Sequence, residues 1–470
     1  MGGPRNLFTQ GDAALGGRDA PLRGPRPRPA RLGAVGEQPV PASGSSVSYK
    51  GPRGTYDVYP GGREPHERAA LWAFVEERAR EILGHHNYRE VRTPVFEEIE
   101  LFARTAGEAS DIVVQKEMFT FRDKGDREMA LRPEGTPGAV RSYIEHNLFK
   151  LAQPVKLFYV GPMFRQERQQ KGRYRQHTQI GVEALGTSDP LVDVEVISLL
   201  YAIHQAVGVK EEVVYLNNLG DLETRRAYVP ELRAYLRKHA GDLDPDSVAR
   251  METNPLRTFD SKHEGTQAVL SEAPKIGAYL SPDAAEHLAV VREGLDALGV
   301  PYELDEQLVR GLDYYTMTVF EAKSGALGAQ DTVGAGGRYN ALISDLGGPD
   351  LGGIGFGTGV ERMLLAAASY ESEPSLDVFF VALAPEARVP AMRLAGALRA
   401  EGISCDLDYG GRGAKGQFKQ ADRTGAAYAA IMGEDELSRG TIKVRDMSSG
   451  EEREVSVSDG SSELLRTIKA

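Results

Sequence analysis

The chain has almost no cysteine and no long apolar run, the features typical of disulfide-stabilised secreted proteins and of membrane-spanning proteins. It has one cysteine, Cys405, among 470 residues, so an internal disulfide is excluded. This composition fits a reducing compartment and predicts a cytoplasmic protein. No apolar run reaches the length of about 18 to 20 residues that a membrane-spanning helix needs, so no membrane association is expected. The formal net charge of −12 excludes a generally basic nucleic-acid-binding surface, and any positive charge that binds RNA must be local.

Composition divides the chain into a tail and a globular part. Residues 1–48 are rich in Gly, Pro, Ala and Arg, which predicts a disordered tail. The tail is basic like a transit peptide, but its proline-rich run cannot form the amphipathic helix of such a peptide. A disordered extension, or a start codon placed too far upstream, is the preferred interpretation. The remaining length is sufficient for two or three domains.

Residues 155–185 predict a β-hairpin with a cationic loop. Val155–Val160 is an apolar run, and 179–185 alternates polar and apolar residues. Alternation places Gln179, Gly181 and Glu183 on one face of the return strand and the apolar residues on the other. The loop carries Arg165, Glu167, Arg168, Lys171, Arg173 and Arg175. Arginine suits forked contacts with phosphate or carboxylate, although the same pattern is equally typical of a solvated hairpin with a basic tip.

Three further segments favour a function. Residues 308–320 read LVRGLDYYTMTVF, 334–339 read GAGGRY, and 352–365 read GGIGFGTGVERMLL. In this order and spacing they resemble the signature segments of histidyl-tRNA synthetases, which are class II aminoacyl-tRNA synthetases. The hairpin resembles class motif 2, residues 352–365 resemble motif 3, and the other two segments resemble the histidine-specific motifs. The resemblance extends from about Tyr49 to the C-terminus.

The resemblance implies an α+β fold. It predicts a class II catalytic domain on a mostly antiparallel sheet over 49–370, with a helical insertion at about 221–300, and an α/β anticodon-binding domain over 376–470. Residues 221–300 carry mostly helical patterns, and strands alternate with helices after residue 376, which predicts a largely parallel sheet. A helix at His66–Leu83 and a strand at Tyr88–Thr93 resemble class motif 1 and imply a homodimer.

The implied reaction joins L-histidine to ATP and then to tRNA(His). Histidine carboxylate attacks the α-phosphate of ATP, so the site needs cations aimed at phosphate. By resemblance the catalytic cations are Arg165 and Arg310. The implied ATP-binding residues are Arg165, Glu167, Arg173, His177 and Arg362. Mg²⁺ is expected on the phosphates with Glu361 as a carboxylate near it, and no tightly bound organic cofactor is expected.

Histidine recognition requires acceptors for the α-ammonium group and a donor–acceptor pair for the imidazole. The resemblance assigns this pocket to Glu134, Gly135, Thr136, Gln179, Glu183, Arg310, Tyr314 and Tyr315. Thr136 has an alternative interpretation as a helix N-cap. The chain departs from the family at His177, where an aromatic carbocycle usually stacks on adenine. This departure puts the affinity for ATP in doubt, not the fold.

Two other functions are alternatives to the synthetase. The inert paralogue that serves as regulatory subunit of ATP phosphoribosyltransferase keeps the catalytic-domain fold. It lacks the C-terminal α/β domain and parts of the arginine set, both of which are present here. A dinucleotide-binding oxidoreductase rests only on glycine-rich turns, and the full fingerprint is missing. The sequence therefore favours the synthetase.

Overall fold

The computed structural model describes residues 49–106, 117–166, 172–310, 314–328, 331–367, 376–458 and 460–469. The tail predicted to be disordered, 1–48, lies outside the described residues.

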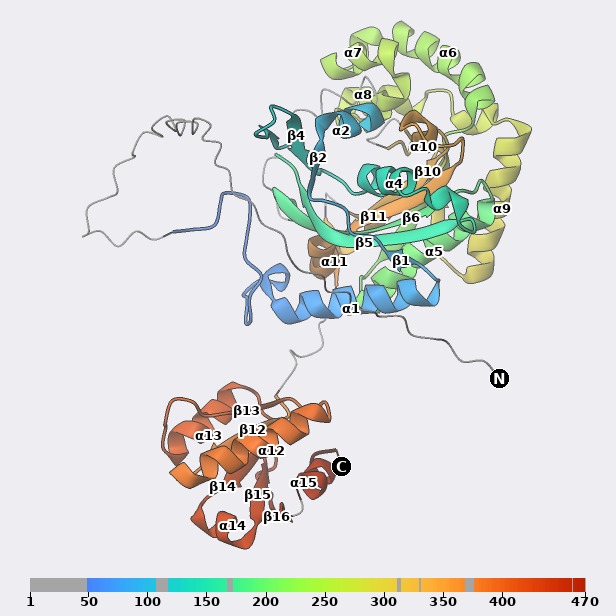
Figure 1. Ribbon diagram of the computed structural model, residues 1–470. Coiled ribbons are helices and arrows are strands. Elements are labelled where there is room, and N and C mark those ends of the chain that lie inside the picture. The colour runs from blue at the N-terminus through green and yellow to red at the C-terminus, as the bar shows by residue number, and fades with distance from the viewer. Residues whose placement is uncertain are drawn as a thin grey trace, which may run out of the picture. The chain divides into compact units, whose positions relative to one another are not determined.

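The larger part of the chain is built on an eight-stranded sheet (Figure 1). Its spatial order is β1 (Arg89–Glu90), β5 (Val155–Phe164), β6 (Gln176–Leu185), β11 (Gly353–Gly359), β10 (Thr332–Tyr339), β9 (Thr316–Ser324), β7 (Glu212–Asn218) and β8 (Tyr302–Leu304). The pairs at the two edges, β1 with β5 and β7 with β8, are parallel, and the described pairs between them are antiparallel. The prediction of a mostly antiparallel sheet is confirmed.

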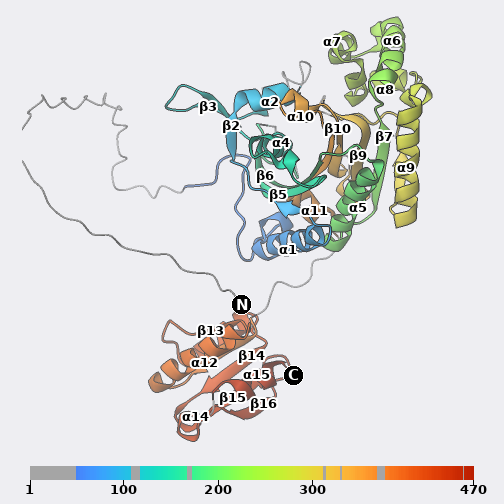
Figure 2. The same cartoon turned by 45° about the vertical axis from the view of Figure 1, so that its right-hand side comes forward.

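Helices cover both faces of this sheet, as Figures 1 and 2 show. On one face, Ile180, Val182 and Ala184 of β6 enter the largest apolar core. The helices of this core are α1 (Ala69–His85), α5 (Pro190–Val207), α9 (Pro282–Leu298) and α11 (Val360–Ala366). On the other face lie α4 (Thr136–Glu145) and the short α10 (Leu342–Asp345). Because side chains alternate along a strand, the β6 residues that face α4 are the polar ones predicted to bind a ligand.

A small sheet leads into α4. Its strands are β2 (Phe96–Glu98), β4 (Glu128–Leu131) and β3 (Thr120–Arg122), and helix α2 (Ile99–Ala106) follows β2. The chain leaves β4 and reaches the first turn of α4 within five residues. Residues 132–136 are therefore held between a strand end and a helix start, as the sequence predicts.

Four helices occupy the region expected to be a helical insertion. They are α6 (Leu222–Lys238), α7 (Pro245–Thr253), α8 (Glu264–Ser271) and α9. The first three share a separate apolar core that contains Tyr228, Leu232 and Leu270. In contrast, α9 contributes Val291 and Leu295 to the main core. The segment with its own core is thus shorter than the helical pattern in the sequence.

The C-terminal part contains a five-stranded sheet. The order is β13 (Cys405–Leu407), β12 (Val378–Ala382), β14 (Tyr428–Met432), β15 (Thr441–Asp446) and β16 (Glu452–Ser456). Helices α12 (Arg388–Ala400), α13 (Ala414–Arg423), α14 (Glu434–Arg439) and α15 (Ser462–Lys469) accompany it. The first three strands are parallel, but β15 and β16 are antiparallel. The alternating pattern correctly predicts the α/β unit and overlooks this closing pair.

Helix α5 is the one described helix that is long and apolar enough to cross a membrane by length and composition alone. Half of its length is buried, and it packs against α1 and α9. Asp193, near its start, is completely buried in an ion pair with Arg338. These features are those of a core helix.

Candidate active site

The predicted hairpin forms and orients its polar face as expected. β5 and β6 pair from Val155 opposite Leu185 to Phe164 opposite Gln176. Arg165 follows β5 directly, and its backbone N–H donates to the carbonyl oxygen of Arg175, which extends the pairing by one step. The Arg165 Nε donates to the Pro133 carbonyl oxygen at 3.1 Å. This bond ties the hairpin to the segment that precedes α4.

A cavity of about 240 Å³ opens over the hairpin and collects most of the residues predicted to bind ATP. Its described lining includes Arg165, Arg173, His177 and Arg362, together with Gln179 and Glu361. Glu167, also predicted to bind ATP, lies outside the described residues, as do Arg168 and Lys171 of the same loop. Three guanidinium groups in one cavity favour a polyanionic ligand.

His177 is a neutral member of this cavity. Burial and the nearby Arg165 charge lower its pKa from 6.5 to about 3, so its imidazole carries no proton charge near neutral pH. A neutral ring can stack on a base or accept a hydrogen bond.

Glu361, the carboxylate expected near Mg²⁺, lies in the first turn of α11. Its Oε1 accepts hydrogen bonds from the Tyr56 hydroxyl at 2.5 Å and from the Thr178 backbone N–H at 2.9 Å. Its Oε2 is buried and has no hydrogen-bond partner, and burial raises the carboxyl pKa to about 7. No cluster of three or more acidic, histidine or cysteine ligands occurs in the described parts of the chain. A single spare carboxylate oxygen fits a Mg²⁺ ion that is held mainly by phosphates and water.

Glu183 is the centre of a buried cluster of hydroxyl groups on the α4 side of the sheet. Its Oε1 accepts from Thr136 Oγ1 at 2.7 Å and from the Tyr159 hydroxyl at 3.4 Å, and its Oε2 accepts from the Tyr339 hydroxyl. Burial raises the pKa of Glu183 to about 8, although these hydrogen bonds oppose the rise. The carboxyl group is therefore poised to gain or lose a proton near neutral pH.

Thr136 does not act as a helix N-cap. The N-cap of α4 is Gly135, and Thr136 is the first helical residue, with its hydroxyl directed at Glu183. The capping interpretation is wrong because Gly135 occupies the N-cap position and no side chain makes the capping hydrogen bond. A Cβ at Gly135 would overlap the Tyr159 ring.

Glu134 links the histidine-pocket residues to the cations. Its Oε2 accepts from the Tyr314 hydroxyl at 3.1 Å. Burial raises the pKa of Glu134, and the Arg165 and Arg310 charges and the Tyr314 bond oppose that rise. The Tyr314 and Tyr315 rings lie 4.6 Å apart, and burial raises the pKa of Tyr315 to about 12, with the Glu183 charge contributing. Most of the predicted histidine-pocket residues thus gather around two carboxyl groups, whereas Gln179 lines the neighbouring cavity.

Arg310 is close to this group but does not line the cavity that Arg165 and Arg362 share. Its guanidinium forms an ion pair with Glu321 of β9. Residues 311–313, the rest of the signature turn, lie outside the described residues. The three predicted cations are therefore brought into one region, with Arg310 on the Glu134 side.

Two glycines of β11 make room for site side chains. A Cβ at Gly357 would overlap Gln179 Nε2, and a Cβ at Gly355 would overlap Glu183 Oε2. The register pairs Gly355 directly with Glu183, whereas Gly357 pairs with Gly181, two residues from Gln179 on the same face of β6. A glycine in a strand interior often marks such a close approach. Close packing around the site therefore explains these two glycines of the segment.

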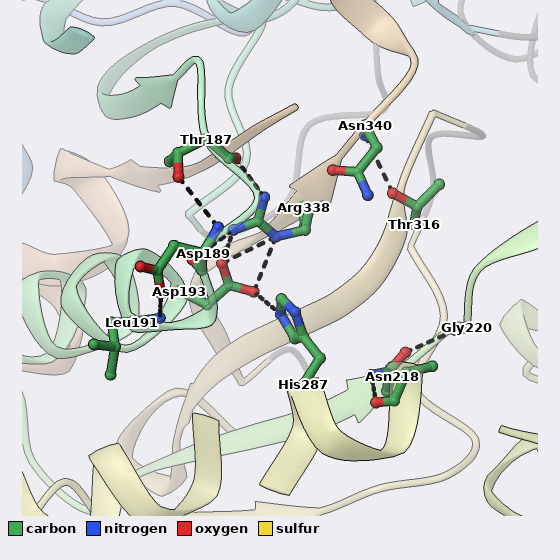
Figure 3. A network of polar contacts seen from close by, with 11 residues as sticks. Thr187, Asp189, Leu191, Asp193, Asn218, Gly220, His287, Thr316, Arg338 and Asn340 are labelled. Atoms are coloured by element: carbon green, nitrogen blue, oxygen red, sulfur yellow. Dashed lines mark hydrogen bonds and ion pairs between the residues drawn. The ribbon is translucent and has the colours of Figure 1, made fainter. Parts of the chain in front are cut away.

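Arg338, in the signature of residues 334–339, has a structural position (Figure 3). It is fully buried, and its Nε donates to Asp193 Oδ1 at 3.0 Å. Asp193 Oδ2 lies 2.7 Å from His287 Nε2 of α9. Arg338 also donates to the carbonyl oxygens of Thr187 and Asp189. The network fixes β10, and hence the adjacent Tyr339, against α5 and α9.

Sequence reasoning missed four residues whose side chains contact the predicted set. Tyr56 bonds Glu361. Tyr159 and Tyr339 bond Glu183, and Glu321 pairs with Arg310. Tyr339 is the last residue of the 334–339 signature segment, so its place in that segment could have predicted a role in the site. Tyr159 and Glu321 have no such signal, because each reaches the site through cross-strand register.

The antiparallel sheet, the hairpin and the glycine-rich strand that runs into α11 define a class II aminoacyl-tRNA synthetase catalytic domain. A family model described as histidyl-tRNA synthetase matches residues 64–363, and one described as an anticodon binding domain matches residues 377–467.

Individual relatives agree with these matches. The histidine–tRNA ligase of Rubrobacter xylanophilus is 68% identical over 425 residues, which cover 90% of this chain and all of the relative. The crystal structure of apo S. aureus histidyl-tRNA synthetase covers 90% of this chain and 100% of its own, with 38% identity and a TM-score of 0.75. A Bacillus halodurans structure described as an ATP phosphoribosyltransferase regulatory subunit/histidyl-tRNA synthetase is 20% identical. It covers 83% of this chain and 99% of its own with a TM-score of 0.61, a likeness of fold alone. The chain belongs to the histidyl-tRNA synthetase family.

Proposed function

We propose that this protein activates L-histidine with ATP to form histidyl-adenylate and pyrophosphate, and then transfers the histidyl group to the 3′ end of tRNA(His). The observation that carries the proposal is the adjacency of two sites. One is the cavity that contains Arg165, Arg173 and Arg362, and the other is the hydroxyl cluster around Glu183.

The first step brings an anion to a polyanion. A carboxylate oxygen of histidine attacks the α-phosphorus, a new P–O bond forms, and the bond to the departing pyrophosphate breaks. Arg165 and Arg310 stabilise the negative charge that develops on the α-phosphate oxygens. Such preorganised charge typically contributes about 3 kcal/mol or more to the transition state.

The nucleotide is held by the rest of the cavity. Arg362 stacks on the adenine and reaches the γ-phosphate, Arg173 contacts the γ-phosphate, and Glu167 faces the adenine amino group. Neutral His177 stacks with a smaller area than a carbocycle. Glu361 offers its unbonded Oε2 to a Mg²⁺ ion, and that ion would neutralise phosphate charge when bound.

Histidine is selected by its two ends. Glu134, Thr136 and Gln179 accept from the α-ammonium group, with Gly135 beside them. Glu183 and Tyr315 read the two imidazole nitrogens, and Tyr314 lines the pocket. Sites of buried hydrogen-bonding groups strongly reject analogues that lack the matching groups.

The C-terminal domain, taken as 376–470, binds the anticodon region of tRNA(His). Its helix α13 exposes Lys415, Lys419 and Arg423, which supply local positive charge in an acidic chain. The catalytic domain comprises 49–370, with a helical insertion at about 221–300. The protein acts as a cytoplasmic homodimer without membrane association and without a tightly bound organic cofactor.

The regulatory-paralogue alternative is disfavoured. That paralogue lacks the C-terminal domain, whereas residues 377–467 match an anticodon-binding family. The arginines at 165, 310 and 362 are also all present.

The test is ATP–pyrophosphate exchange with each of the twenty amino acids, followed by charging of tRNA(His). Histidine alone is expected to support exchange. Absence of histidine-dependent exchange above background contradicts the proposal, and exchange without tRNA charging limits the protein to adenylate formation.

A further inference from the structure

Two cations assigned to phosphate binding, Arg310 and Arg362, are joined by a chain of hydrogen bonds across two strands. The Arg310 guanidinium pairs with Glu321 Oε1. The Thr332 hydroxyl donates to Glu321 Oε2 at 3.3 Å. The Arg362 Nε donates to the Thr332 carbonyl oxygen at 2.5 Å. Glu321 on β9 and Thr332 on β10 therefore lie between the two arginines.

An irregularity in the sheet brings Glu321 and Thr332 together. Ala335 lies opposite Glu321, and simple alternation would place Thr332, three residues earlier, on the other face of β10. The register shifts between Thr332 and Gly334, so Thr332 lies opposite Lys323 instead. Lys323 shares a face with Glu321, and Thr332 consequently joins them. Bulges of this type often redirect a side chain next to a functional site.

The bridge is shielded from water, and among the described residues it supplies the ion pair of Arg310. The Arg310 and Glu321 side chains are 21% and 15% exposed, so their attraction is only weakly screened by water. The Arg310 Nε is buried without a hydrogen-bond partner, which leaves the ion pair to orient the group. Lys323 is the other cation near Glu321, at 3.9 Å, but its Nζ lies over the Tyr215 ring, 4.4 Å from the centroid.

We propose that Glu321 and Thr332 are positioning residues that set Arg310 and Arg362 in a fixed mutual geometry for the ATP phosphates. The inference rests on the proposed roles of the two arginines. Glu321 orients the Arg310 guanidinium. Thr332 connects the two arginines, because its hydroxyl donates to Glu321 and its backbone carbonyl accepts from Arg362. Neither residue contacts the substrate.

The experiment measures histidine-dependent pyrophosphate exchange for Glu321→Ala, Glu321→Gln and Thr332→Val. Valine keeps the shape of threonine and the carbonyl bonded to Arg362 but removes the hydroxyl. The control is Glu293→Gln, which neutralises an exposed carboxylate on α9, outside the bridge. Misplaced catalytic groups can cost about 100-fold in rate, so kcat should fall by about 10- to 100-fold for Glu321→Ala. A smaller loss is expected for Thr332→Val, and an intermediate one for Glu321→Gln.

A positioning role predicts that KM for histidine stays unchanged while kcat falls. It also predicts that Glu321→Ala has a much smaller effect in an Arg310→Lys background, where the fork is already lost. Wild-type kcat in both Glu321→Ala and Thr332→Val overturns the inference. The inference is also overturned if Glu321→Ala lowers kcat as much in the Arg310→Lys background as in the wild type. A rise in KM for histidine that accompanies the loss of kcat overturns it as well. If the wild-type protein shows no histidine-dependent exchange, the proposed function fails instead.

Discussion

Replacing Glu183 with glutamine should change how the stability of the catalytic domain depends on pH. Burial raises the pKa of Glu183 from 4.5 to about 8 in the folded protein. The folded state therefore holds this proton more tightly than the unfolded chain does. The stabilisation is complete below pH 4.5 and is lost as the pH rises towards 8. The difference between these pKa values corresponds to roughly 5 kcal/mol at most.

Glutamine keeps the shape of the side chain but cannot ionise. We therefore expect Glu183→Gln to gain free energy of unfolding relative to the wild type between pH 5 and pH 9, by several kcal/mol within the bound of about 5. Urea unfolding followed by tryptophan fluorescence is the assay, because the chain has one tryptophan, Trp72, which is buried in α1 of the catalytic part. The C-terminal domain is silent in this signal.

The control is Glu293→Gln, an exposed position on α9, where no pH-dependent difference is expected. If Glu183→Gln differs from the wild type by the same amount at pH 5 and pH 9, the reasoning is refuted. Glu183 would then be ionised in the folded protein, with its three hydroxyl donors outweighing burial.

Three other changes test the site. Arg310→Ala should lower exchange by about 100-fold or more, corresponding to roughly 3 kcal/mol, and leave histidine binding measured by calorimetry largely intact; near-normal exchange would contradict its role. Gly357→Ala should raise KM for histidine at least about tenfold, since its Cβ would displace Gln179. The control Gly396→Ala on α12 has open space around its Cβ and should leave KM unchanged. Equal KM values for Gly357→Ala and the wild type would exclude this close approach. Deletion of residues 376–470 should impair tRNA charging far more than exchange, and equal losses would show that the domain supports the catalytic fold.

Local patterns in the sequence were sufficient to predict the framework of the site. Alternation along β6 correctly placed Glu183 on the polar face. The resemblance placed Arg165 and Arg362 together, and one cavity contains both. These features depend on neighbours within one element or on motifs in a known order.

Features that depend on the residue-by-residue register between strands were not predictable. Tyr159 lies opposite Gly181, and a Cβ on that glycine would overlap the tyrosine ring. The register shift that turns Thr332 towards Glu321 has no signal in either strand alone. The antiparallel pairing of β15 and β16 was missed for a related reason: the alternation of strands and helices continues through α14 to β15, so it does not indicate that β15 reverses direction.

The buried network of Arg338, Asp193 and His287 also bears on how the family can diversify. One carboxylate serves both a guanidinium and an imidazole in a region closed to solvent. Loss of one partner in such a pair usually costs about 3 to 5 kcal/mol, because the remaining charge stays buried. Substitutions at these three positions should therefore appear jointly in related chains. In contrast, α6, α7 and α8 share a separate core, so substitutions on these helices require no matching change at the three network positions.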